Sequence, residues 1–315
     1  MARFIVRRAI AMVAVLFAIS VLTFAIFNVI PNSDPAIRLA GHNQTTGQLE
    51  AIRHQWGFDK PLYVQYAKTM QKIFTGDVVS YANQTNVVDE IKHDLPATFS
   101  LAIGAAIIWM VVAVAIGLYT AMRAGHFADR FLTVLALIGI SMPVFWVGAL
   151  MGYYLGFRWK IFPNGGYVPL TQNPLDWAYH LILPWTALSL LFIGVYSRVL
   201  RSNVLDTIND DYVRTARAKG LSERQVMLRH VLRNSLIPIV TLWGLDFAAV
   251  IGGGAILTET VFDLQGVGQY AAESVGQLDI PPVLTIVMFG AFFVVLLNAV
   301  VDVLYAALDP RIRLT

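Results

Sequence analysis

The stretch ATFSLAIGAAIIWMVVAVAIGLYT, residues 97–120, contains no charged side chain and decides the fold class. A helix needs about 20 apolar residues to cross the roughly 30 Å hydrocarbon core of a bilayer, and this run is long enough. Because such runs are too long for barrel strands, the sequence predicts an all-α membrane protein. With this run, the chain has six predicted transmembrane helices, and the other five lie near residues 9–30, 131–156, 180–197, 236–258 and 283–306.

The composition agrees with a membrane location. Hydrophobic residues make up 57% of the chain and charged residues 14%, whereas soluble domains average about 25% charged residues. The chain has no cysteine, which excludes disulfides and thiolate metal sites. The net charge of +3 is explained by the distribution of basic residues around the spans, so we expect no nucleic-acid partner.

Lysine and arginine are distributed unevenly between the predicted loops. With a cytoplasmic N-terminus, the inner segments 1–8, 121–130, 198–235 and 307–315 hold most of the 23 basic residues. Most of the others lie in the stretch 31–95, which is long enough for its charges to have little influence on orientation. This bias predicts that both termini are cytoplasmic, and a cysteine-free outer segment fits a bacterial cytoplasmic membrane.

The spans divide the chain into three parts. Residues 1–30 form the cytoplasmic N-terminus and first span, 31–95 an extracytoplasmic helical segment, and 96–315 a five-span core. The segment 31–95 is too long for a plain connector. It either packs as helices on the spans and the interface or takes a direct part in receiving substrate. The longest cytoplasmic loop of the core is 199–235.

This loop contains a short predicted helix that begins at Asp210 or Asp211. The acidic residues at its start and the basic Arg217 and Lys219 near its end complement the helix dipole at both ends. Gly220 is placed to take the left-handed conformation that ends a helix. The loop therefore contains a helix and a sharp turn, and a helix this short must pack on something to be stable.

A second helix is predicted directly after the turn. Ser222 and Gln225 have the spacing of a capping box at its start, and it leads back to the next span. We expect the exposed face of the first helix to mix Tyr212, Val213 and Ala216 with basic residues. Such a face fits a groove on a soluble partner, and the alternative is a positive loop that lies on anionic lipid.

Several strings resemble one family of transporters. Arg214-Thr215-Ala216, followed three residues later by Gly220, resembles the EAA loop of ABC-importer permeases, with Arg214 and Thr215 departing from its Glu and Ala. The string His230–Asn234 is similar to the dipeptide/oligopeptide/nickel subfamily in particular. Gly57–Leu62 and Leu95–Thr98 resemble the first permease subunit of that subfamily.

The resemblance implies the type I ABC-importer permease fold and a non-catalytic permease subunit. Its expected partners are a second homologous permease, two cytoplasmic ABC ATPases that hydrolyse ATP, and an extracytoplasmic substrate-binding protein. The cargo would be di- or oligopeptides, with nickel or another small solute as the alternative. The residues expected to couple the chain to the ATPases are Asp211, Tyr212, Arg214, Thr215, Ala216, Arg217, Lys219, Gly220 and Leu221.

Motifs for catalysis are absent from the sequence. The chain has no phosphate loop of the form Gly-x4-Gly-Lys-Ser/Thr and no His-Glu-x-x-His pair, so we expect it to bind neither ATP nor a catalytic metal. A membrane-embedded enzyme and a scaffold protein are the alternatives from other classes. Copurification with an ATPase separates them from a permease.

Three residues are candidates for the translocation path. Asp246 lies about 15 Å into its span, where a charge costs about 2.5–3.5 kcal/mol on insertion scales. It either lines the path or bonds to another helix. Gly253, within Gly252-Gly253-Gly254, serves close packing or a moving element. Glu259, near the outer end of that span, either borders a gate or extends toward the interface.

Overall fold

The computed structural model describes residues 2–28, 47, 50, 53, 54 and 57–308, and within them the regular secondary structure is helical. The β pairing there is an isolated bridge between Val79 and Asn86. The all-α prediction is confirmed. The elements in chain order are α1 (Ala2–Asn28), α4 (Leu62–Thr75), α5 (Val87–Met122), α6 (Phe127–Ser141), α7 (Val144–Met151) with the π-helical η1 (Gly152–Arg158), α8 (Pro174–Thr207), α9 (Asp211–Ala218), α10 (Glu223–Gln225) with the π-helical η2 (Val226–Val231), α11 (Leu232–Ala249) with the π-helical η3 (Val250–Gly254), α12 (Ile256–Val261), α13 (Val267–Gly276) and α14 (Ile280–Leu308).

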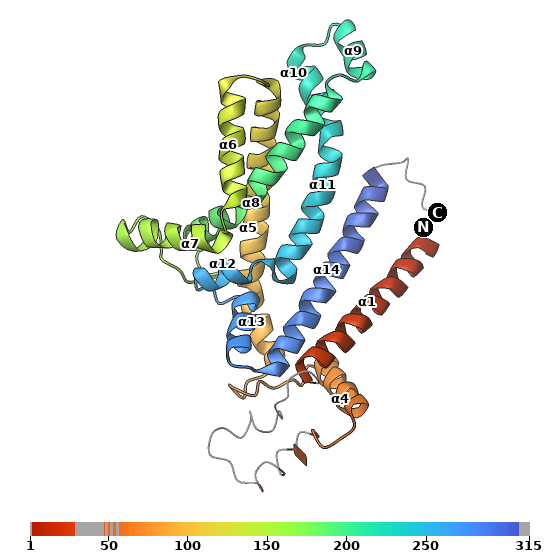
Figure 1. Ribbon diagram of the computed structural model, residues 1–315, viewed down its shortest axis with the longest axis vertical. Coiled ribbons are helices and arrows are strands. Elements are labelled where there is room, and N and C mark those ends of the chain that lie inside the picture. The colour runs from red at the N-terminus through yellow and green to blue at the C-terminus, as the bar shows by residue number, and fades with distance from the viewer. Residues whose placement is uncertain (1, 29–46, 48–49, 51–52, 55–56, 309–315) are drawn as a thin grey trace.

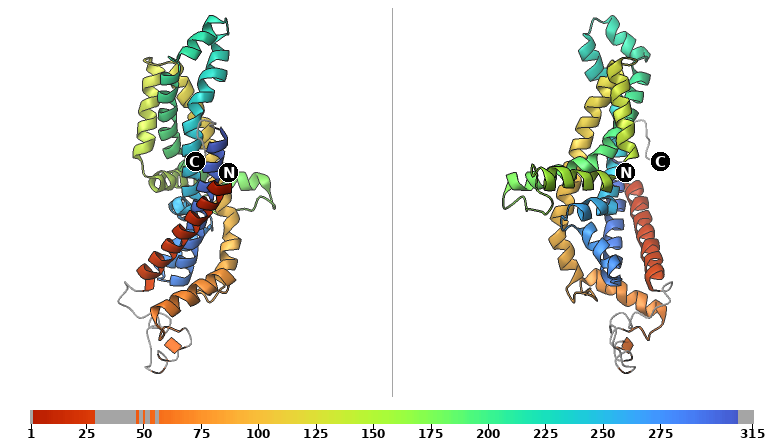
Figure 2. Two further views of the ribbon diagram at one scale, coloured as in Figure 1. Left: turned by 90° about the vertical axis from the view of Figure 1, so that its right-hand side faces the viewer. Right: turned by 60° about the vertical axis from the view of Figure 1, so that its left-hand side comes forward.

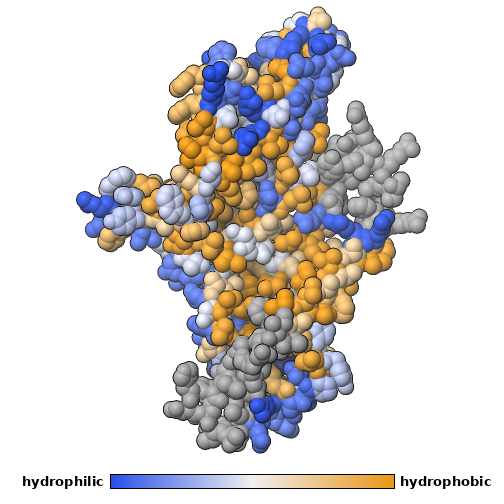
Figure 3. All heavy atoms as spheres, in the orientation of Figure 1, coloured by the Kyte–Doolittle hydropathy of each residue, from blue (hydrophilic) through white to orange (hydrophobic). Residues whose placement is uncertain are grey.

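Long apolar helices form the body of the molecule. On the face shown in Figure 3, apolar side chains gather over the middle of the molecule, and hydrophilic side chains gather at the end that carries α9 and at the opposite end. This distribution is the one expected of a chain that crosses a bilayer, and five of the six predicted spans are single helical segments. These segments are Val6–Ile26, Val87–Met122, Pro174–Thr207, Glu223–Gly254 and Ile280–Val301.

The predicted span 131–156 is not one continuous helix but two bent pieces, which together are long and apolar enough for one broken span. Helix α6 ends at Ser141, and the chain turns by 99° before α7 and η1 begin. Pro143 lacks a backbone N–H and disfavours helical geometry at the residue before it, so Met142 is extended with ψ of 130°. As a result, α7 projects sideways from the bundle (Figure 1).

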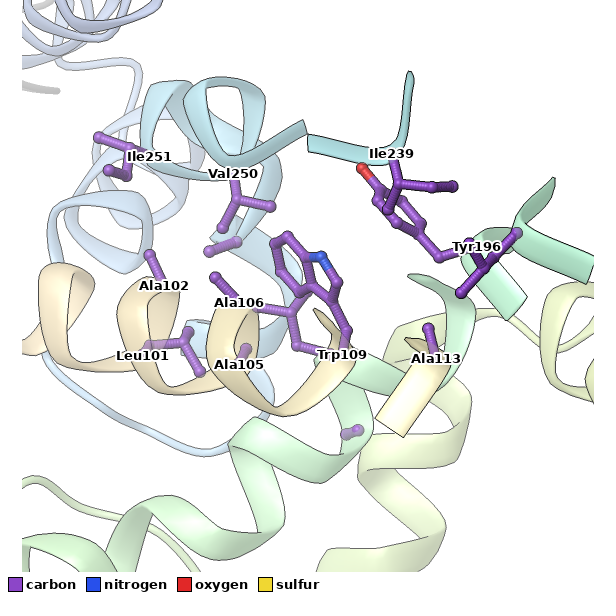
Figure 4. Close-up of a cluster of buried hydrophobic side chains, with 14 of the residues drawn as sticks. Leu101, Ala102, Ala105, Ala106, Trp109, Ala113, Tyr196, Ile239, Val250 and Ile251 are labelled. Atoms are coloured by element: carbon purple, nitrogen blue, oxygen red, sulfur yellow. The ribbon is translucent and has the colours of Figure 1, made fainter. Parts of the chain in front are cut away.

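Helices α5 and α8 form the central pair of the bundle. Small residues of α5 face α8 and the neighbouring helices, and they surround the fully buried Trp109 (Figure 4). Trp185 of α8 lies directly over Gly104 and donates from Nε1 to the Ser100 carbonyl at 2.9 Å. In lipid, where no hydrophobic force draws helices together, such close packing is the main source of association.

The other helices are arranged around this pair. Helix α6 joins α8 through Arg201, which donates to both carboxylate oxygens of Asp129 at 2.7 and 2.8 Å. Helices α1, α14 and α11 lie side by side on the opposite flank, as all views show (Figures 1 and 2). The loop segment with α9 and α10 forms one end of the molecule, and α4 lies near the other.

The predicted helical segment 31–95 is described as continuous chain from residue 57, where it contains α4 and the start of α5. The greater part of the stretch before residue 57 lies outside the described residues. The described part is fastened to the spans. Asp279, just before α14, accepts bonds from the Ser80 hydroxyl at 2.5 Å and the Tyr81 N–H at 2.9 Å, and Tyr66 of α4 bonds to Ser20 of α1 at 2.7 Å.

We expect Gly104→Val to separate α5 from α8, because a Cβ at this position would overlap the Trp185 ring. Overpacking of a tight core typically costs about 1–3 kcal/mol. The variant should lower the midpoint of thermal unfolding, followed by tryptophan fluorescence in detergent. Gly276→Ala, which adds a methyl group in open space, is the control, and equal midpoints for the two variants would contradict the packing.

Candidate functional site

The segment between α8 and α11 forms a rigid helical corner. Helix α9 ends in a Schellman motif, in which the Gly220 N–H donates to the Arg217 carbonyl at 2.9 Å and the Leu221 N–H to the Ala216 carbonyl at 3.4 Å. Gly220 takes φ of +78°, so the predicted left-handed stop is confirmed. A Cβ on Gly220 would meet no atom within 4 Å, so backbone conformation alone favours glycine there.

An ion pair closes the turn on its other side. The Arg217 guanidinium donates to the two oxygens of Glu223 at 3.1 and 2.6 Å. The pair is exposed and therefore contributes little stability, but its two-pronged geometry fixes the angle between α9 and α10. The Gln225 side chain accepts from the Ser222 N–H at 3.3 Å, as expected for one arm of the predicted capping box.

The inward face of α9 differs from the prediction. Val213 and Ala216 were expected on the exposed face, but they are 0% and 5% exposed and belong to the apolar core that includes Val226 and Met227 of η2. This correction has a simple cause. A helix of eight residues is stable only if it buries one face, and its two apolar residues at i and i+3 are that face.

A polar bond adds to this attachment. The Asn234 side-chain amide of α11 donates to the Tyr212 hydroxyl at 2.7 Å. Through this bond and the buried apolar contacts, α9 is fastened to η2 and α11. In the sequence, Asn234 belongs to the string His230–Asn234, and no local pattern marks it as the partner of Tyr212.

The outward face of α9 is polar and basic, and of the prediction for this face the basic residues are confirmed. Asp211 and Arg214 are exposed and 3.5 Å apart, and the Thr215 hydroxyl donates back to the Asp211 carbonyl within the helix. Lys219 follows the last turn and is exposed. Leu221 is partly exposed beside this basic surface, with 39% of its area accessible. All the residues predicted to couple the chain to a partner lie in this corner, and all except Ala216 are exposed there.

The helix that follows the corner contains two of the three other predicted residues, Asp246 and Gly253, and Glu259 lies just beyond it in α12. Residues Glu223–Gly254 form one long span, which has π-helical turns at η2 and η3. Such turns are common at functional positions. Gly253 in η3 takes φ of +132°, a conformation that side chains rarely allow, and marks the bend toward α12.

The neighbouring glycine serves close packing. A Cβ on Gly252 would overlap the Val294 side chain of α14, and a Cβ on Gly290 would lie 2.6 Å from the Gly252 carbonyl oxygen. The backbones of η3 and α14 are therefore in contact. Close packing, one of the two interpretations of the glycine run, is therefore seen at Gly252, and Gly253 forms the bend.

Asp246 bonds to another helix. The Tyr196 hydroxyl of α8 donates to its carboxylate at 2.6 Å, and Tyr196 itself is only 1% exposed. Tyr196 packs beside Trp109 in the central cluster, where its hydroxyl points toward α11 (Figure 4). The bond links the span Glu223–Gly254, which is the fifth predicted span and is called the span-five helix below, to the α5–α8 pair.

Glu259 lies where three helices meet. Its side chain is fully buried, and its Oε2 accepts from the Gln269 N–H at 3.0 Å, at the start of α13. Thr98 of α5 accepts from the Val267 N–H at 2.9 Å in the same place. Among the described residues, Oε1 of Glu259 has no hydrogen-bond partner. Burial raises the pKa of the Glu259 carboxyl, although hydrogen bonds act in the opposite direction.

Glu259 was expected to border a gate or to extend toward the interface, and complete burial excludes the second interpretation. It lines a cavity of about 90 Å³ together with Gly253 and Thr98. Sequence reasoning missed Thr98 and Gln269 as its neighbours. No local signal identifies them, since Thr98 lies on a helix far away in the chain.

The arrangement so far is an exposed basic corner fastened to a long, bent apolar helix. Residues 113–314 match the family described as binding-protein-dependent transport system inner membrane component. The chain belongs to this family. Residues 1–102 match the N-terminal model for such membrane components. The chain is thus a multi-pass permease subunit of an ABC importer system, which works with ATPase subunits and a substrate-binding protein.

Relatives cover the chain from end to end. It is 34% identical to the probable peptide ABC transporter permease protein y4tP of Sinorhizobium fredii, over 98% of this chain and 99% of that one. It is 34% identical to the oligopeptide transport system permease protein AppB of Bacillus subtilis, over 99% and 100%. It is 33% identical to the dipeptide transport system permease protein DppB of Escherichia coli, over 99% of both.

A solved structure supports the predicted fold. An inward-facing form of the MetNI methionine ABC transporter aligns with a TM-score of 0.50 and 16% identity, over 71% of this chain and 96% of that one. At this identity the likeness concerns the fold alone, and it agrees with the predicted type I permease fold of the family.

We expect Tyr212→Phe to loosen α9 from α11, because the Asn234 amide loses its acceptor. A neutral hydrogen bond of this kind contributes about 0.5–1.5 kcal/mol. Amide hydrogen exchange in residues 211–218 should therefore accelerate, by up to about tenfold. Arg214→Gln, on the exposed face, should leave exchange unchanged, and similar rates in both variants would refute the attachment.

We expect Tyr196→Phe and Asp246→Leu to be coupled energetically. Each change alone leaves one polar partner without its bond, at a cost of about 1–3 kcal/mol. The double variant removes both partners and should be less destabilised than the sum of the single variants. Unfolding of the complex in mixed micelles measures the three free energies, and strict additivity would show that the two groups act separately.

Proposed function

We propose that this chain is a permease subunit of an ATP-driven importer of peptides, which a substrate-binding protein delivers. The observation that carries the proposal is the match, over nearly the whole length, to permeases named for peptide, oligopeptide and dipeptide transport. The family membership assigns the transport role, and these names supply the cargo. The three peptide-named relatives align over at least 98% of this chain, so the proposal does not depend on one shared segment.

The α9 end of the molecule is the cytoplasmic end in this proposal. The excess of lysine and arginine in the inner segments supports it, because positive loops are retained on the cytoplasmic side. Both termini are then cytoplasmic, α4 lies on the outer side, and the membrane is the bacterial cytoplasmic membrane. A second, homologous permease and two ATPase subunits or domains complete the complex.

Helix α9 is the coupling element in this proposal. Its basic outward face, with Arg214 and Lys219, docks in a groove of an ATPase. Its inward face, with Val213 and Ala216, is packed on η2 at the start of the span-five helix. Displacement of α9 by the ATPases therefore moves the span-five helix with it, because the two share a buried apolar contact rather than a flexible linker.

The movement reaches the outer half of the chain through the same helix. Gly253 supplies the hinge between η3 and α12, and Glu259 ties α12 to α13 at the closed outer end of the path. Asp246 serves the movement as the contact that aligns the span-five helix with α8. We place the translocation path along this helix, with Gly253 and Glu259 facing its outer part.

Uptake by the reconstituted complex tests the function. Proteoliposomes that contain both permeases and the ATPases, with binding protein and a labelled tripeptide outside and ATP inside, should accumulate the peptide. Accumulation should need ATP and the binding protein. ATP hydrolysis that responds to the binding protein without peptide uptake, together with uptake of another solute, would overturn the peptide assignment.

We expect Gly220→Val to uncouple ATP hydrolysis from uptake, since a β-branched residue strongly disfavours φ of +78° and would rearrange the corner. Uptake should fall at least tenfold while the complex retains ATP hydrolysis. Gly220→Asn is the matched control, because asparagine tolerates the left-handed region far better. Equal uptake by the two variants would exclude a coupling role for this corner.

A further inference from the structure

A cavity of about 190 Å³ lies at the α4 end of the molecule, between α4, the bridge segment 78–81 and the ends of α1 and α14. Its lining combines an apolar wall with polar and cationic groups. The apolar wall includes Phe24, Phe58, Ile73 and Leu284, and the polar side includes Gln65, Lys68, Thr69 and Lys72. The proposed coupling of the chain to ATP does not use this cavity.

The side chain of Gln65 positions the chain next to the cationic side of the cavity. The Gln65 amide donates to the Phe58 carbonyl at 3.2 Å and to the Lys60 carbonyl at 2.7 Å. These bonds fold the segment 57–60 back onto α4. Lys60 is thereby held beside Lys68, where both side chains come within 3.8 Å of the Cβ position at Gly57.

The Lys60 and Lys68 side chains lie close together beside Gly57. The pKa of Lys68 is lowered, first by its hydrogen-bonding contact with Lys60 and by the charge of that residue. Lys72 adds to the effect, and Asp59 opposes it weakly. Among the described residues, neither Lys60 nor Lys68 has an ion pair. Two like charges in contact are unfavourable, and an anion placed between them would relieve the repulsion.

The neighbouring acidic group does not neutralise this pair. Asp279 is 3% exposed, and its oxygens already accept from the Ser80 hydroxyl and from the N–H groups of Tyr81 and Ala82. Its carboxylate fastens the bridge segment that forms one wall. In the described part of the chain, the lining of the cavity therefore contains lysines and no Asp or Glu beside an apolar wall.

We propose that this cavity binds the C-terminal residue of a peptide, with its side chain against the apolar wall and its carboxylate at the cavity edge, between Lys68, which lines the cavity, and Lys60 beside it. The proposal rests on the proposed peptide import and names a contact for that cargo. Charge-assisted hydrogen bonds from ammonium groups to a carboxylate are the strong kind. Thr69 and Gln65 provide further polar groups at the same side of the cavity.

The size of the cavity determines which part of a ligand it holds. The volume of the cavity is about 190 Å³. It lies below the roughly 300–1,000 Å³ of pockets that enclose a whole small ligand. One amino-acid residue matches this space, whereas the two acyl chains of a phospholipid do not. The remainder of the peptide would extend toward the outside.

Binding of two matched peptides to the purified complex tests the proposal. The probes are Ala-Ala-Leu and its C-terminal amide, and saturation-transfer NMR with the nucleotide-free complex in lipid nanodiscs measures their affinities. The free acid should bind at least about tenfold more tightly, because the amide lacks the negative charge. The double variant Lys60→Gln/Lys68→Gln should weaken the acid at least about tenfold and leave the amide unchanged.

Lys92→Gln is the matched control, since Lys92 is exposed, pairs with Asp89 and lies outside the cavity. It should bind both peptides as the unmodified complex does. Equal affinity for acid and amide, or acid binding that survives the double variant, would overturn the proposal. Absence of peptide binding together with weaker attachment of the binding protein to the double variant would overturn it in favour of an acidic side chain of that protein.

The result is independent of the transport assay. Binding to the nucleotide-free complex requires neither ATP nor the binding protein, so it can succeed or fail whatever the uptake measurement shows. Failure of peptide uptake with intact acid-selective binding would contradict the proposed function alone. Normal uptake by the double variant, with acid and amide bound equally by the unmodified complex, would contradict the cavity assignment alone.

Discussion

The close approach of α5 and α8 is the contact on which the other packing depends. Lipid solvates apolar side chains as well as protein does, so helices in a membrane associate through tight van der Waals contact and a few polar bonds. Small residues on α5 allow this contact, and Trp185 covers Gly104. The pair then presents Tyr196 to Asp246 of α11 and Thr98 to the start of α13. In the proposed mechanism, α9 and the span-five helix move relative to this pair.

The attachment of α9 to the helix that follows it determines how motion would pass from a docked ATPase in the proposed mechanism. A docking helix on a flexible loop would absorb the motion of its partner. Here Val213 and Ala216 are buried on η2, Tyr212 bonds to Asn234, and Arg217 bridges the turn to Glu223. These contacts join α9 to a helix that continues to Gly254. Its bend at Gly253 comes where the backbone of α14 is in direct contact, so in the proposed mechanism movement at one end changes the packing at the other.

The sequence predicted the features that follow from composition and local backbone chemistry. Long apolar runs identify spans because lipid leaves no other solution for the backbone, and Gly220 was predicted as a helix stop from its position after basic residues. The break at Met142–Pro143 was also visible in the sequence as a proline within an apolar run. Hydropathy alone does not show the break, because α7 is apolar like α6 even though it turns away from it.

Features that depend on distant contacts could not be predicted in the same way. Which face of α9 is buried depends on η2, and in eight residues the apolar positions fit either a docking face or a packing face. The burial of Glu259 depends on Thr98, which is on a helix far away in the chain. The Lys60–Lys68 contact likewise needs Gln65 to fold the preceding loop onto α4. In each case a polar or small residue is given its role by a partner outside its own helix. The residues proposed to contact the cargo belong to this class. The residues proposed to receive the driving motion are mostly specified by their neighbours in the sequence. The coupling corner was therefore easier to recognise than the cargo contacts.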